Sequence, residues 1–364
     1  MEHESRVSVT AWLDARPTRR LPELRPFDPR EASPGVGLWG HAPAFPFPLP
    51  HRLIGTEVGA VPLEPYDLPR GDRRCWLLRE DLEPSGAWTD RGAALFACAL
   101  REAEHRSCIH VSRGNSALSL ARMAQPAGVH LTAYLPAATR DARKVLVRRH
   151  QARVLEIVGP FSACEKAARR AAKDAHGPEV HADPFFLLGA ASMALCIIER
   201  LGTMPGVVVA PVGDGRLLAG LREGFAAAAA AGVGASPVLI GVQPEVCCPI
   251  ARAWFEGTTV HPAAPAPTRA LADNLLVTMP RWGEQALAAA RSSGGAIVVS
   301  DELALDRALR GLWLAGLAVE PSAALGLAFV LDESSQQALE GAGEIVVVLT
   351  GHGLREGLSV CAGL

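Results

Sequence analysis

From about residue 75 onward, short apolar runs alternate with helical segments, and this alternation constrains the fold of the 364-residue chain more than any other feature. The runs are rich in β-branched residues and bounded by turn signals, as strands are: CWLLRE, CIHVS, VHLTAYLP, ARVLEIVG, GVVVAPVG, PVLIGVQP, AIVVS and EIVVVLTG. Segments of helical pattern lie between them, such as TDRGAALFACALREAEHR. Because the runs are almost continuously apolar, helices should cover both faces of each sheet. The pattern predicts an α/β fold with parallel sheets, and the length favours two lobes or one large α/β unit.

Composition argues against several classes of partner. Charged residues make up 20% of the chain and the formal net charge is −2, so no strong field favours nucleic acid or an acidic membrane. The eight cysteines form no CxxC pair and lie mostly in apolar runs, which favours buried thiols in a reducing compartment. No uninterrupted apolar stretch reaches 18 residues, and the N-terminus has no signal-peptide core. We therefore expect a cytoplasmic protein with no nucleic-acid or membrane partner.

The first 65 residues differ from the rest. Residues 1–35 are polar, charged and without period, and are interpreted as an N-terminal extension. Residues 36–65 are rich in proline yet apolar, which predicts an ordered extended segment wrapped on the body of the protein.

One strand–turn–helix motif, GVVVAPVGDGRLLAGLREGF at 206–225, has the form of an anion site. Gly213 and Gly215 would let a phosphate approach the backbone N–H groups at the start of the helix. The alternative is a tight turn with no ligand. A dinucleotide-binding reading is weak, because Leu218 stands where that fingerprint has its third glycine.

Two further motifs place polar residues where strands end. HVSRGNSALSLARMA (110–124) has serine, glycine and asparagine residues at the expected start of a helix. One interpretation is that they donate hydrogen bonds to a carboxylate, and the other is that they only cap the helix. EIVVVLTGHGLREG (344–357) ends a strand in Thr350, which meets a ligand in an α/β crevice or caps a helix. No spacing of His, Cys, Asp and Glu resembles a zinc site, and we expect no metal.

Taken in order, PSGAWTDRG, VSRGNSAL, APVGDGRLLAG, AVEPSAALGLA and LTGHGL resemble the motifs of the fold-type II pyridoxal-phosphate enzymes, the tryptophan synthase β-like family. Within it, the threonine synthase pattern is most similar, and the likeness covers roughly residues 36–357. The resemblance implies a two-domain, three-layer parallel fold. Residues 36–92 and 191–364 would form the larger α/β domain and 93–190 the smaller one.

The resemblance also implies roles for particular residues. Four residues would cradle a cofactor phosphate: Gly213, Asp214, Gly215 and Leu217. Arg216, where the family keeps a small residue, would support that phosphate site or fill it. Asn115 would face the 3-hydroxyl of the pyridine ring and Thr350 its nitrogen. The residues along a substrate carboxylate would be Ser112, Gly114 and Ser116, with Glu320 lining the same crevice.

Thr89 stands where the resemblance places the lysine that binds the cofactor as an imine. A threonine hydroxyl forms no stable imine and does not ionise near neutral pH. The chain has three lysines, Lys144, Lys166 and Lys173, all on arginine-rich helices whose charges we expect to be solvated. Pyridoxal phosphate would therefore bind only non-covalently, or not at all, and Thr89, Asp90 and Arg113 would be the working groups. Arg113 could clamp an anion or face solvent.

These observations leave three interpretations of function. The first is a lyase-like enzyme acting on an amino-acid-like or other small carboxylate by elimination, replacement or cyclisation. The second is an inactive pseudoenzyme serving as a partner or regulatory subunit, and the third an engineered Thr89. The family is commonly dimeric, so a homodimer is expected. Phe185, Phe186, Leu187 and Leu188 replace polar groups of the family pattern, which favours a more apolar, non-phosphorylated substrate.

Overall fold

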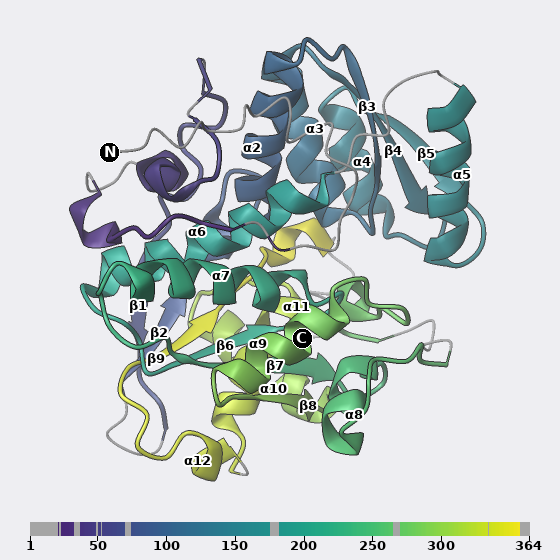
Figure 1. Ribbon diagram of the computed structural model, residues 1–364. Coiled ribbons are helices and arrows are strands. Elements are labelled where there is room, and N and C mark those ends of the chain that lie inside the picture. The colour runs from purple at the N-terminus through teal and green to yellow at the C-terminus, as the bar shows by residue number, and fades with distance from the viewer. Residues whose placement is uncertain are drawn as a thin grey trace.

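The computed structural model describes residues 21, 23–32, 37–48, 50–51, 53–69, 74–174, 182–264, 270–333 and 335–356. Its strands form two sheets (Figure 1). The larger sheet has the order β1 (Leu63–Tyr66), β2 (Cys75–Leu78), β9 (Ile345–Val348), β6 (Val207–Pro211), β7 (Val238–Pro244) and β8 (Ala296–Ser300). The smaller sheet has the order β3 (Ser107–Val111), β4 (His130–Pro136) and β5 (Arg153–Ile157). All described pairs are parallel except β1 with β2, so the predicted α/β class is confirmed.

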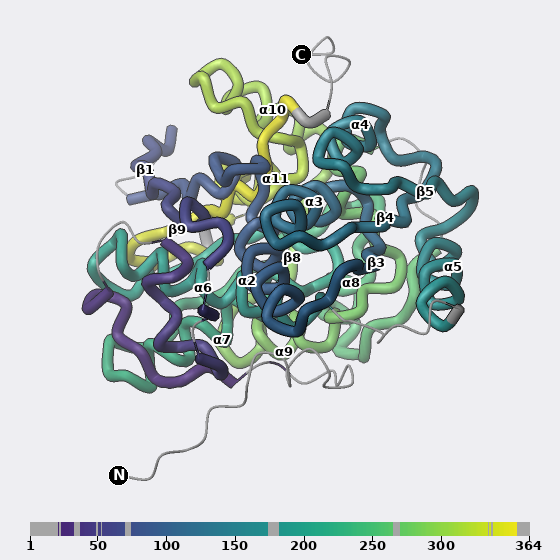
Figure 2. Tube along the Cα trace, turned by 90° about the horizontal axis from the view of Figure 1, so that it is seen from above, coloured from purple at the N-terminus to yellow at the C-terminus, as the bar shows by residue number. Residues whose placement is uncertain are grey.

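Helices cover both sheets. The α-helices are α2 (Thr89–Glu102), α3 (Asn115–Ala127), α4 (Asp141–Arg149), α5 (Phe161–Asp174), α6 (Asp183–Leu201), α7 (Arg216–Ala230), α8 (Pro249–Glu256), α9 (Gly283–Ser292), α10 (Glu302–Leu314), α11 (Pro321–Leu331) and α12 (Ser335–Ala338). The 3₁₀ helices are η1 (Pro29–Glu31), η2 (Gly37–Ala44), η3 (Glu80–Leu82), η4 (Asp273–Leu275) and η5 (Gly353–Glu356). Helices α6 and α7 run between the two sheets, and the view from above places α2 and α3 beside β3 and β4 (Figures 1 and 2). The predicted domain boundaries at residues 92 and 190 stay a prediction.

The proline-rich segment is ordered but not extended throughout. Residues 37–44 form η2, most of whose side chains are buried, including Leu38 and Trp39. Gly37 permits this turn because its φ is 59° and a Cβ would press on the backbone of Val58. The predicted order is confirmed, but the predicted extended conformation is wrong for residues 37–44, where the burial of large apolar side chains accompanies a 3₁₀ helix.

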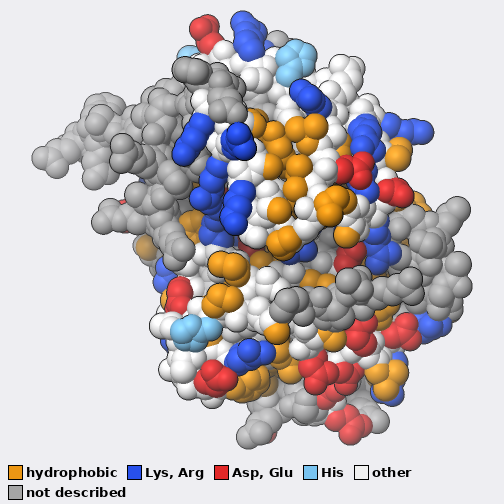
Figure 3. All heavy atoms as spheres, turned by 90° about the vertical axis from the view of Figure 1, so that its right-hand side faces the viewer, with side chains coloured by type: hydrophobic (Ala, Val, Ile, Leu, Met, Phe, Trp, Pro, Cys, Tyr) orange, Lys and Arg blue, Asp and Glu red, His pale blue; other side chains and the backbone are white. Residues whose placement is uncertain are grey.

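Charge is distributed unevenly over the surface. The face toward α5 and α8 shows many basic side chains in its upper half and acidic ones mainly in its lower half (Figure 3). Lys166, Arg169 and Arg170 of α5 are exposed on the helix. The surface on the smaller-sheet side is therefore locally basic, although the net charge of the protein is near zero.

Helix α6 is the apolar centre of the fold. By length and composition it could cross a membrane, with a mean hydropathy of 1.6 over an 18-residue window, but 78% of that window is buried inside the protein. A helix that is apolar on all sides is typical of a large protein's core. The structure therefore accounts for this apolar helix as a core element.

Glycines let α2 and α6 cross in backbone contact. A Cβ on Gly92 would lie 2.5 Å from the Cα of Phe186, and one on Gly189 would lie 2.5 Å from the amide nitrogen of Gly92. No side chain fits at either position without moving one of the helices. The crossing therefore fixes the start of α2 relative to α6.

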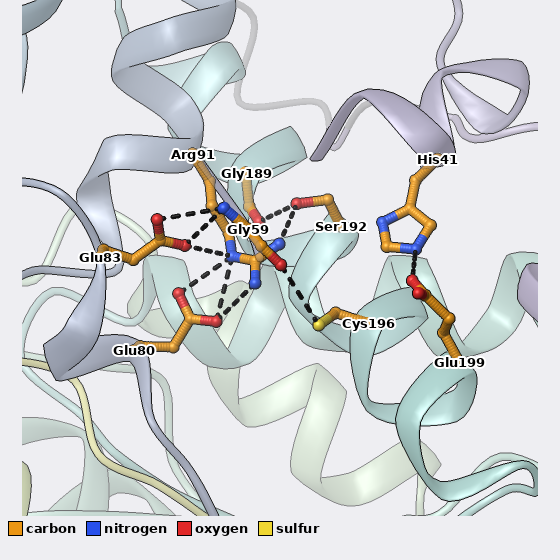
Figure 4. A network of polar contacts seen from close by, with 9 residues as sticks. All are labelled: His41, Gly59, Glu80, Glu83, Arg91, Gly189, Ser192, Cys196 and Glu199. Carbon is orange, nitrogen blue, oxygen red and sulfur yellow. Dashed lines mark hydrogen bonds and ion pairs between the residues drawn. The ribbon is translucent and has the colours of Figure 1, made fainter. Parts of the chain in front are cut away.

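A buried arginine reinforces the same crossing (Figure 4). Arg91 is fully buried, and its Nη2 lies 2.6 Å from Glu80 Oε1, while its Nε lies 3.3 Å from Glu83 Oε1. Glu83 also accepts the Gly59 N–H. Burial, together with the neighbouring charge of Glu80, raises the pKa of Glu83 well above its usual value. The cluster joins the N-terminal segment to α2. Because the raised pKa favours the neutral form of Glu83, the single cation of Arg91 does not face two ionised carboxylates.

We predict that Gly92→Ala destabilises the protein by at least about 2 kcal/mol, because the added methyl group must displace the backbone of α6. Urea denaturation monitored by circular dichroism measures the change. Gly311→Ala in α10 is the matched control, since a Cβ there meets nothing within 4 Å. The control should be neutral or stabilising by about 0.5–1 kcal/mol. Equal stability of both variants would contradict the proposed role of the crossing.

Candidate functional site

The three sequence motifs meet at one cavity of about 940 Å³. Strands β3, β6 and β9 each end just before a cavity segment, at Ser112, Gly213 and Thr350 respectively. Helices α2, α3 and α7 begin at this cavity, so the positive ends of three helix dipoles lie beside it. This is the crevice outside the carboxyl ends of parallel strands where α/β proteins bind ligands.

Most of the predicted site residues line this cavity. They are Thr89, Ser112, Arg113, Asn115, Ser116, Gly213, Asp214, Gly215, Arg216, Leu217, Glu320 and Thr350. Asp90 is fully buried behind the cavity wall and Gly114 is not part of the lining. Gly114 has a φ of 131°, and a Cβ there would lie 2.8 Å from Arg143 Cδ, so the turn itself requires glycine. The structure thus places these residues together, while their ligand contacts stay predictions.

Thr89 is the outer end of a chain of hydroxyl groups. Its Oγ1 lies 2.7 Å from Ser119 Oγ, and Ser119 Oγ lies 3.0 Å from Ser85 Oγ. Ser85 donates its hydroxyl to Asp90 Oδ1 and its backbone N–H to Asp90 Oδ2 at 2.6 Å. Three hydroxyl groups therefore connect the cavity to the fully buried carboxylate of Asp90.

None of the three lysines, all within the described residues, lines the cavity. Lys166 and Lys173 are exposed on α5, as expected. Lys144 is instead buried, and its Nζ contacts Glu156 at 2.8 Å, Asp141 at 2.9 Å and the carbonyl of Ala137 at 2.9 Å. The prediction that its charge is solvated was wrong, because carboxylates of the chain neutralise it.

The turn before α7 is held by its own side chains. Asp214 caps the helix by accepting the Arg216 N–H at 3.0 Å on Oδ1, and its Oδ2 lies 2.7 Å from Arg216 Nη2. Gly215 has a φ of 92°, and a Cβ there would collide with the backbone of Trp282. The tight-turn alternative therefore accounts for Gly215 without a ligand, and a carboxylate already takes the first helix N–H.

Arg216 belongs to an ion-pair chain that crosses the cavity wall. Its Nη2 lies 3.2 Å from Asp183 Oδ1, and Asp183 Oδ2 lies 2.5 Å from Arg281 Nη1. Burial alone would raise the pKa of Asp183, but Arg216 and Arg281 hold it below its usual value. The guanidinium of Arg216 also lies over the ring of Phe186 at 5.4 Å. Its buried Nε has no hydrogen-bond partner, so one donor is still open to an anion.

Asparagine and glutamate side chains meet in another part of the cavity lining. Asn115 Nδ2 donates to both oxygens of Glu320, at 3.1 and 3.2 Å, and Asn274 Nδ2 reaches Glu320 Oε2 at 3.3 Å. The buried Oδ1 atoms of Asn115 and Asn274 have no partner. Both are acceptors that a ligand hydroxyl or N–H would satisfy.

Arg113 is held in the cavity by an aromatic ring. Its guanidinium lies 5.0 Å from the centroid of the Phe161 ring, and burial lowers its pKa from the ordinary arginine value. Within the described part of the chain no carboxylate forms an ion pair with it. The solvent-facing alternative does not describe this half-buried, cavity-lining position. A stacked guanidinium without a counter-ion is suited to bind a carboxylate.

The four apolar residues of α6 do not form a substrate wall. Phe185, Phe186, Leu187 and Leu188 are all fully buried and none lines the cavity. Phe185 packs against Phe96 and Phe47 in the core beside α2. These residues therefore do not support the inference of a more apolar substrate, which stays a prediction, because an apolar core helix and an apolar pocket wall have the same composition.

The sequence interpretation missed five polar residues of the site. They are His110, Ser119, Asp183, Asn274 and Arg281. Ser119 is three residues beyond Ser116 on α3, so helical spacing would have placed both on one face. His110 directly precedes the serine loop, which was the only local signal for it. The other three depend on contacts between distant segments.

We predict that Asp214→Asn raises the affinity for inorganic phosphate by about tenfold, because asparagine preserves the helix cap while removing the negative charge beside Arg216. Fluorescence titration, with Trp282 against the turn as reporter, measures the affinity. Arg216→Ala is the counterpart and should weaken binding. Unchanged affinity in Asp214→Asn would show that the pair does not close an anion site.

Comparison with known proteins agrees with this architecture. A family model described as "Pyridoxal-phosphate dependent enzyme" matches residues 54–351. Threonine synthase of Methanosarcina acetivorans is 26% identical over 327 residues, covering 88% of this chain and 80% of the relative. A threonine deaminase of T.th. superposes with a TM-score of 0.65 at 27% identity, covering 77% of this chain and 87% of that one. Maize serine racemase, at 19% identity, shares the fold with a TM-score of 0.69 over 80% and 87% of the two chains. The chain belongs to the family of pyridoxal-phosphate dependent enzymes.

Proposed function

We propose that this chain is a divergent, threonine synthase-like enzyme that acts on an amino-acid-like or other small carboxylate substrate without a lysine imine. The hydroxyl chain from Thr89 to Asp90 is the observation that carries the proposal. Thr89 lies in PSGAWTDRG, where the resemblance to the family motif places the lysine. The chain would perform lyase-like elimination, replacement or cyclisation with its own acid–base groups.

The buried carboxylate of Asp90 determines the direction of each hydrogen bond in this series of hydroxyl groups. With Asp90 ionised, the carboxylate only accepts, so Ser85 must donate its hydroxyl proton to it. Ser119 then donates to Ser85, and Thr89 donates to Ser119. The lone pairs of Thr89 Oγ1 are left for the cavity, where they accept a proton from a bound substrate. Each hydroxyl then passes its own proton inward, and Asp90 gains one.

The binding end of the proposed reaction is Arg113. Its guanidinium, stacked on Phe161, presents a cation to the cavity. A substrate carboxylate bound there would lie in the same cavity as Thr89 and the Asn115–Glu320 pair. Holding both reacting groups in one cavity supplies the proximity that such a proton transfer needs.

Members of the family bind pyridoxal phosphate, and this site fits that cofactor only in part. The unpartnered Oδ1 of Asn115 suits a hydroxyl on a pyridine ring, and Thr350 lies on the same wall. At the phosphate end, however, Asp214 occupies the helix cap and pairs with Arg216. A phosphate would meet the Asp214 carboxylate and would have to displace it from Arg216. The site as paired here does not fit the phosphorylated cofactor, and the proposed proton transfer does not use it. Cofactor admitted by opening of the Asp214–Arg216 pair would bind non-covalently, because no lysine lines the cavity.

A pseudoenzyme acting as a partner or regulatory subunit is the second candidate. The observation in its favour is that the chain's own carboxylates pair with Arg216 in the turn before α7. A homodimer in the cytoplasm is part of either proposal. Turnover that depends on Thr89 separates the two.

We predict that wild-type protein mixed with pyridoxal phosphate shows no imine absorbance band and no adduct after borohydride reduction, because no lysine lines the cavity. Thr89→Lys, which restores an amine at the start of α2, should produce both once the phosphate site is opened by Asp214→Asn. Mass spectrometry of the reduced protein locates the adduct. An adduct at Lys144, Lys166 or Lys173 of the wild type that persists in the presence of free lysine would contradict the proposal.

We further predict that Thr89→Val lowers the turnover rate by at least about 10²-fold on any small carboxylate that screening identifies as a substrate. The substitution removes the hydroxyl and keeps the shape of the side chain. Thr89→Ser is the matched control and should retain activity, because it preserves the bond to Ser119. Steady-state kinetics with thermal melting of each variant supply the measurement. Equal rates in both variants would show that the hydroxyl chain does not move the proton.

A further inference from the structure

A second chain of polar groups lies in the same cavity and is independent of Thr89. His110, near the end of β3, has its Nε2 atom 2.9 Å from Ser116 Oγ, in the first turn of α3. Ser116 Oγ is in turn 2.9 Å from Ser112 Oγ. All three residues line the cavity, and Ser116 is partly exposed to it. A hydroxyl beside an imidazole is the arrangement of an activated nucleophile.

Backbone donors determine where each proton of this chain lies. Ser112 Oγ accepts the N–H of Gly114 at 2.9 Å and the N–H of Ala117 at 3.2 Å. Both of its lone pairs are therefore used, so its own proton goes to Ser116. Ser116 must then donate to the other neighbour, the Nε2 atom of His110. Nε2 carries no proton, and the imidazole is the tautomer protonated on Nδ1.

The imidazole is held in position and in the neutral form. His110 stacks on the ring of Phe186, with centroids 5.7 Å apart and planes inclined by 28°. Burial, and then the charge of Arg216 on α7, lower its pKa to about 4, although Asp183 on α6 opposes the shift. Above that pH the Nε2 lone pair is available to take the proton of Ser116. A base oriented by a third group is the second requirement of a nucleophile–base pair.

The surroundings of Ser116 favour negative charge. The residue lies at the N-terminus of α3, the positive end of the helix dipole. Arg113, two residues before the helix begins, adds a guanidinium with no carboxylate in an ion pair among the described residues. A strand, a turn through Gly114 and a helix together present the hydroxyl in the cavity. These groups would stabilise an oxyanion formed next to Ser116.

We propose that Ser116 is a nucleophile with His110 as its base, and that the cavity takes the acyl group of an activated carboxylic ester or thioester. Ser116 Oγ bonds to the acyl carbon while its proton passes to His110 Nε2. The bond from that carbon to the alcohol or thiol breaks, and the leaving group receives the proton from His110. Water then gives a proton to the same imidazole and bonds to the acyl carbon. The bond from that carbon to Ser116 Oγ breaks, His110 returns the proton to Oγ, and the acid is released. This activity goes beyond the proposed function and does not use the Thr89 hydroxyl.

A fluorophosphonate probe tests the proposal without knowledge of the natural substrate. Its phosphorus bonds to Ser116 Oγ, fluoride leaves, and the serine proton passes to His110. We expect one adduct per chain, located at Ser116 by peptide mass spectrometry and absent from Ser116→Ala. His110→Asn should lower the labelling rate by about 10²–10⁴-fold. Arg170→Ala, an exposed position on α5 outside the cavity lining, should label like the wild type. Labelling is measured without turnover of a small carboxylate, so failure here and failure of the proposed function are distinguishable.

The pH profile of the wild type supplies a test that needs no variant. Labelling should be constant from pH 8 to pH 5 and fall to half near pH 4, where His110 gains its proton. A histidine with its ordinary pKa would instead lose half of its reactivity near pH 6.5. Absence of an adduct, an adduct on another residue, or labelling at Ser116 that is independent of His110 and of pH would each overturn the proposal.

Discussion

The backbone contact between α2 and α6 is the constraint on which the cavity depends. Gly92 and Gly189 let the two helices touch, and the buried Arg91 binds the carboxylates of Glu80 and Glu83 beside them. Thr89 lies one turn before Gly92, so the crossing determines where its hydroxyl meets Ser119. Phe186, at the same crossing, supports both His110 and Arg216 through its ring. One close contact in the core thus determines the positions of three polar side chains of the site, those of Thr89, His110 and Arg216.

The sequence was sufficient for the fold and for the location of the site. Each of the apolar runs predicted as strands is a strand, since β-branched residues between turn residues have few alternatives in an α/β chain. Gly213, Asn115 and Thr350 meet because the carboxyl ends of parallel strands lie at the same edge, a rule that needs no coordinates. Local pattern and topology together therefore predict which segments face the cavity.

The sequence could not give the pairing of charges and hydroxyls within it. That Asp214 cradles a phosphate stays a prediction, and its spacing gave no sign that its carboxylate accepts the Arg216 N–H and pairs with the Arg216 guanidinium. Lys144 was expected to be solvated, yet the carboxylates of Glu156 and Asp141 bind its ammonium group. Ser119 has no local motif, and its contact with Thr89 exists only because α2 and α3 pack together. Such contacts depend on tertiary structure rather than on spacing.

The two hydroxyl chains have a joint consequence for how a carboxylate can bind. Ser116 and Ser119 lie one turn apart on α3, yet with Asp90 ionised their protons point to different acceptors, His110 and Ser85. Ser112 and Thr89 donate into these same chains. The hydroxyl groups predicted to donate to a substrate carboxylate therefore have their protons already engaged. The carboxylate must then be bound by Arg113 and by backbone N–H groups at the start of α3, which leaves the hydroxyl oxygens facing the cavity as acceptors and nucleophiles.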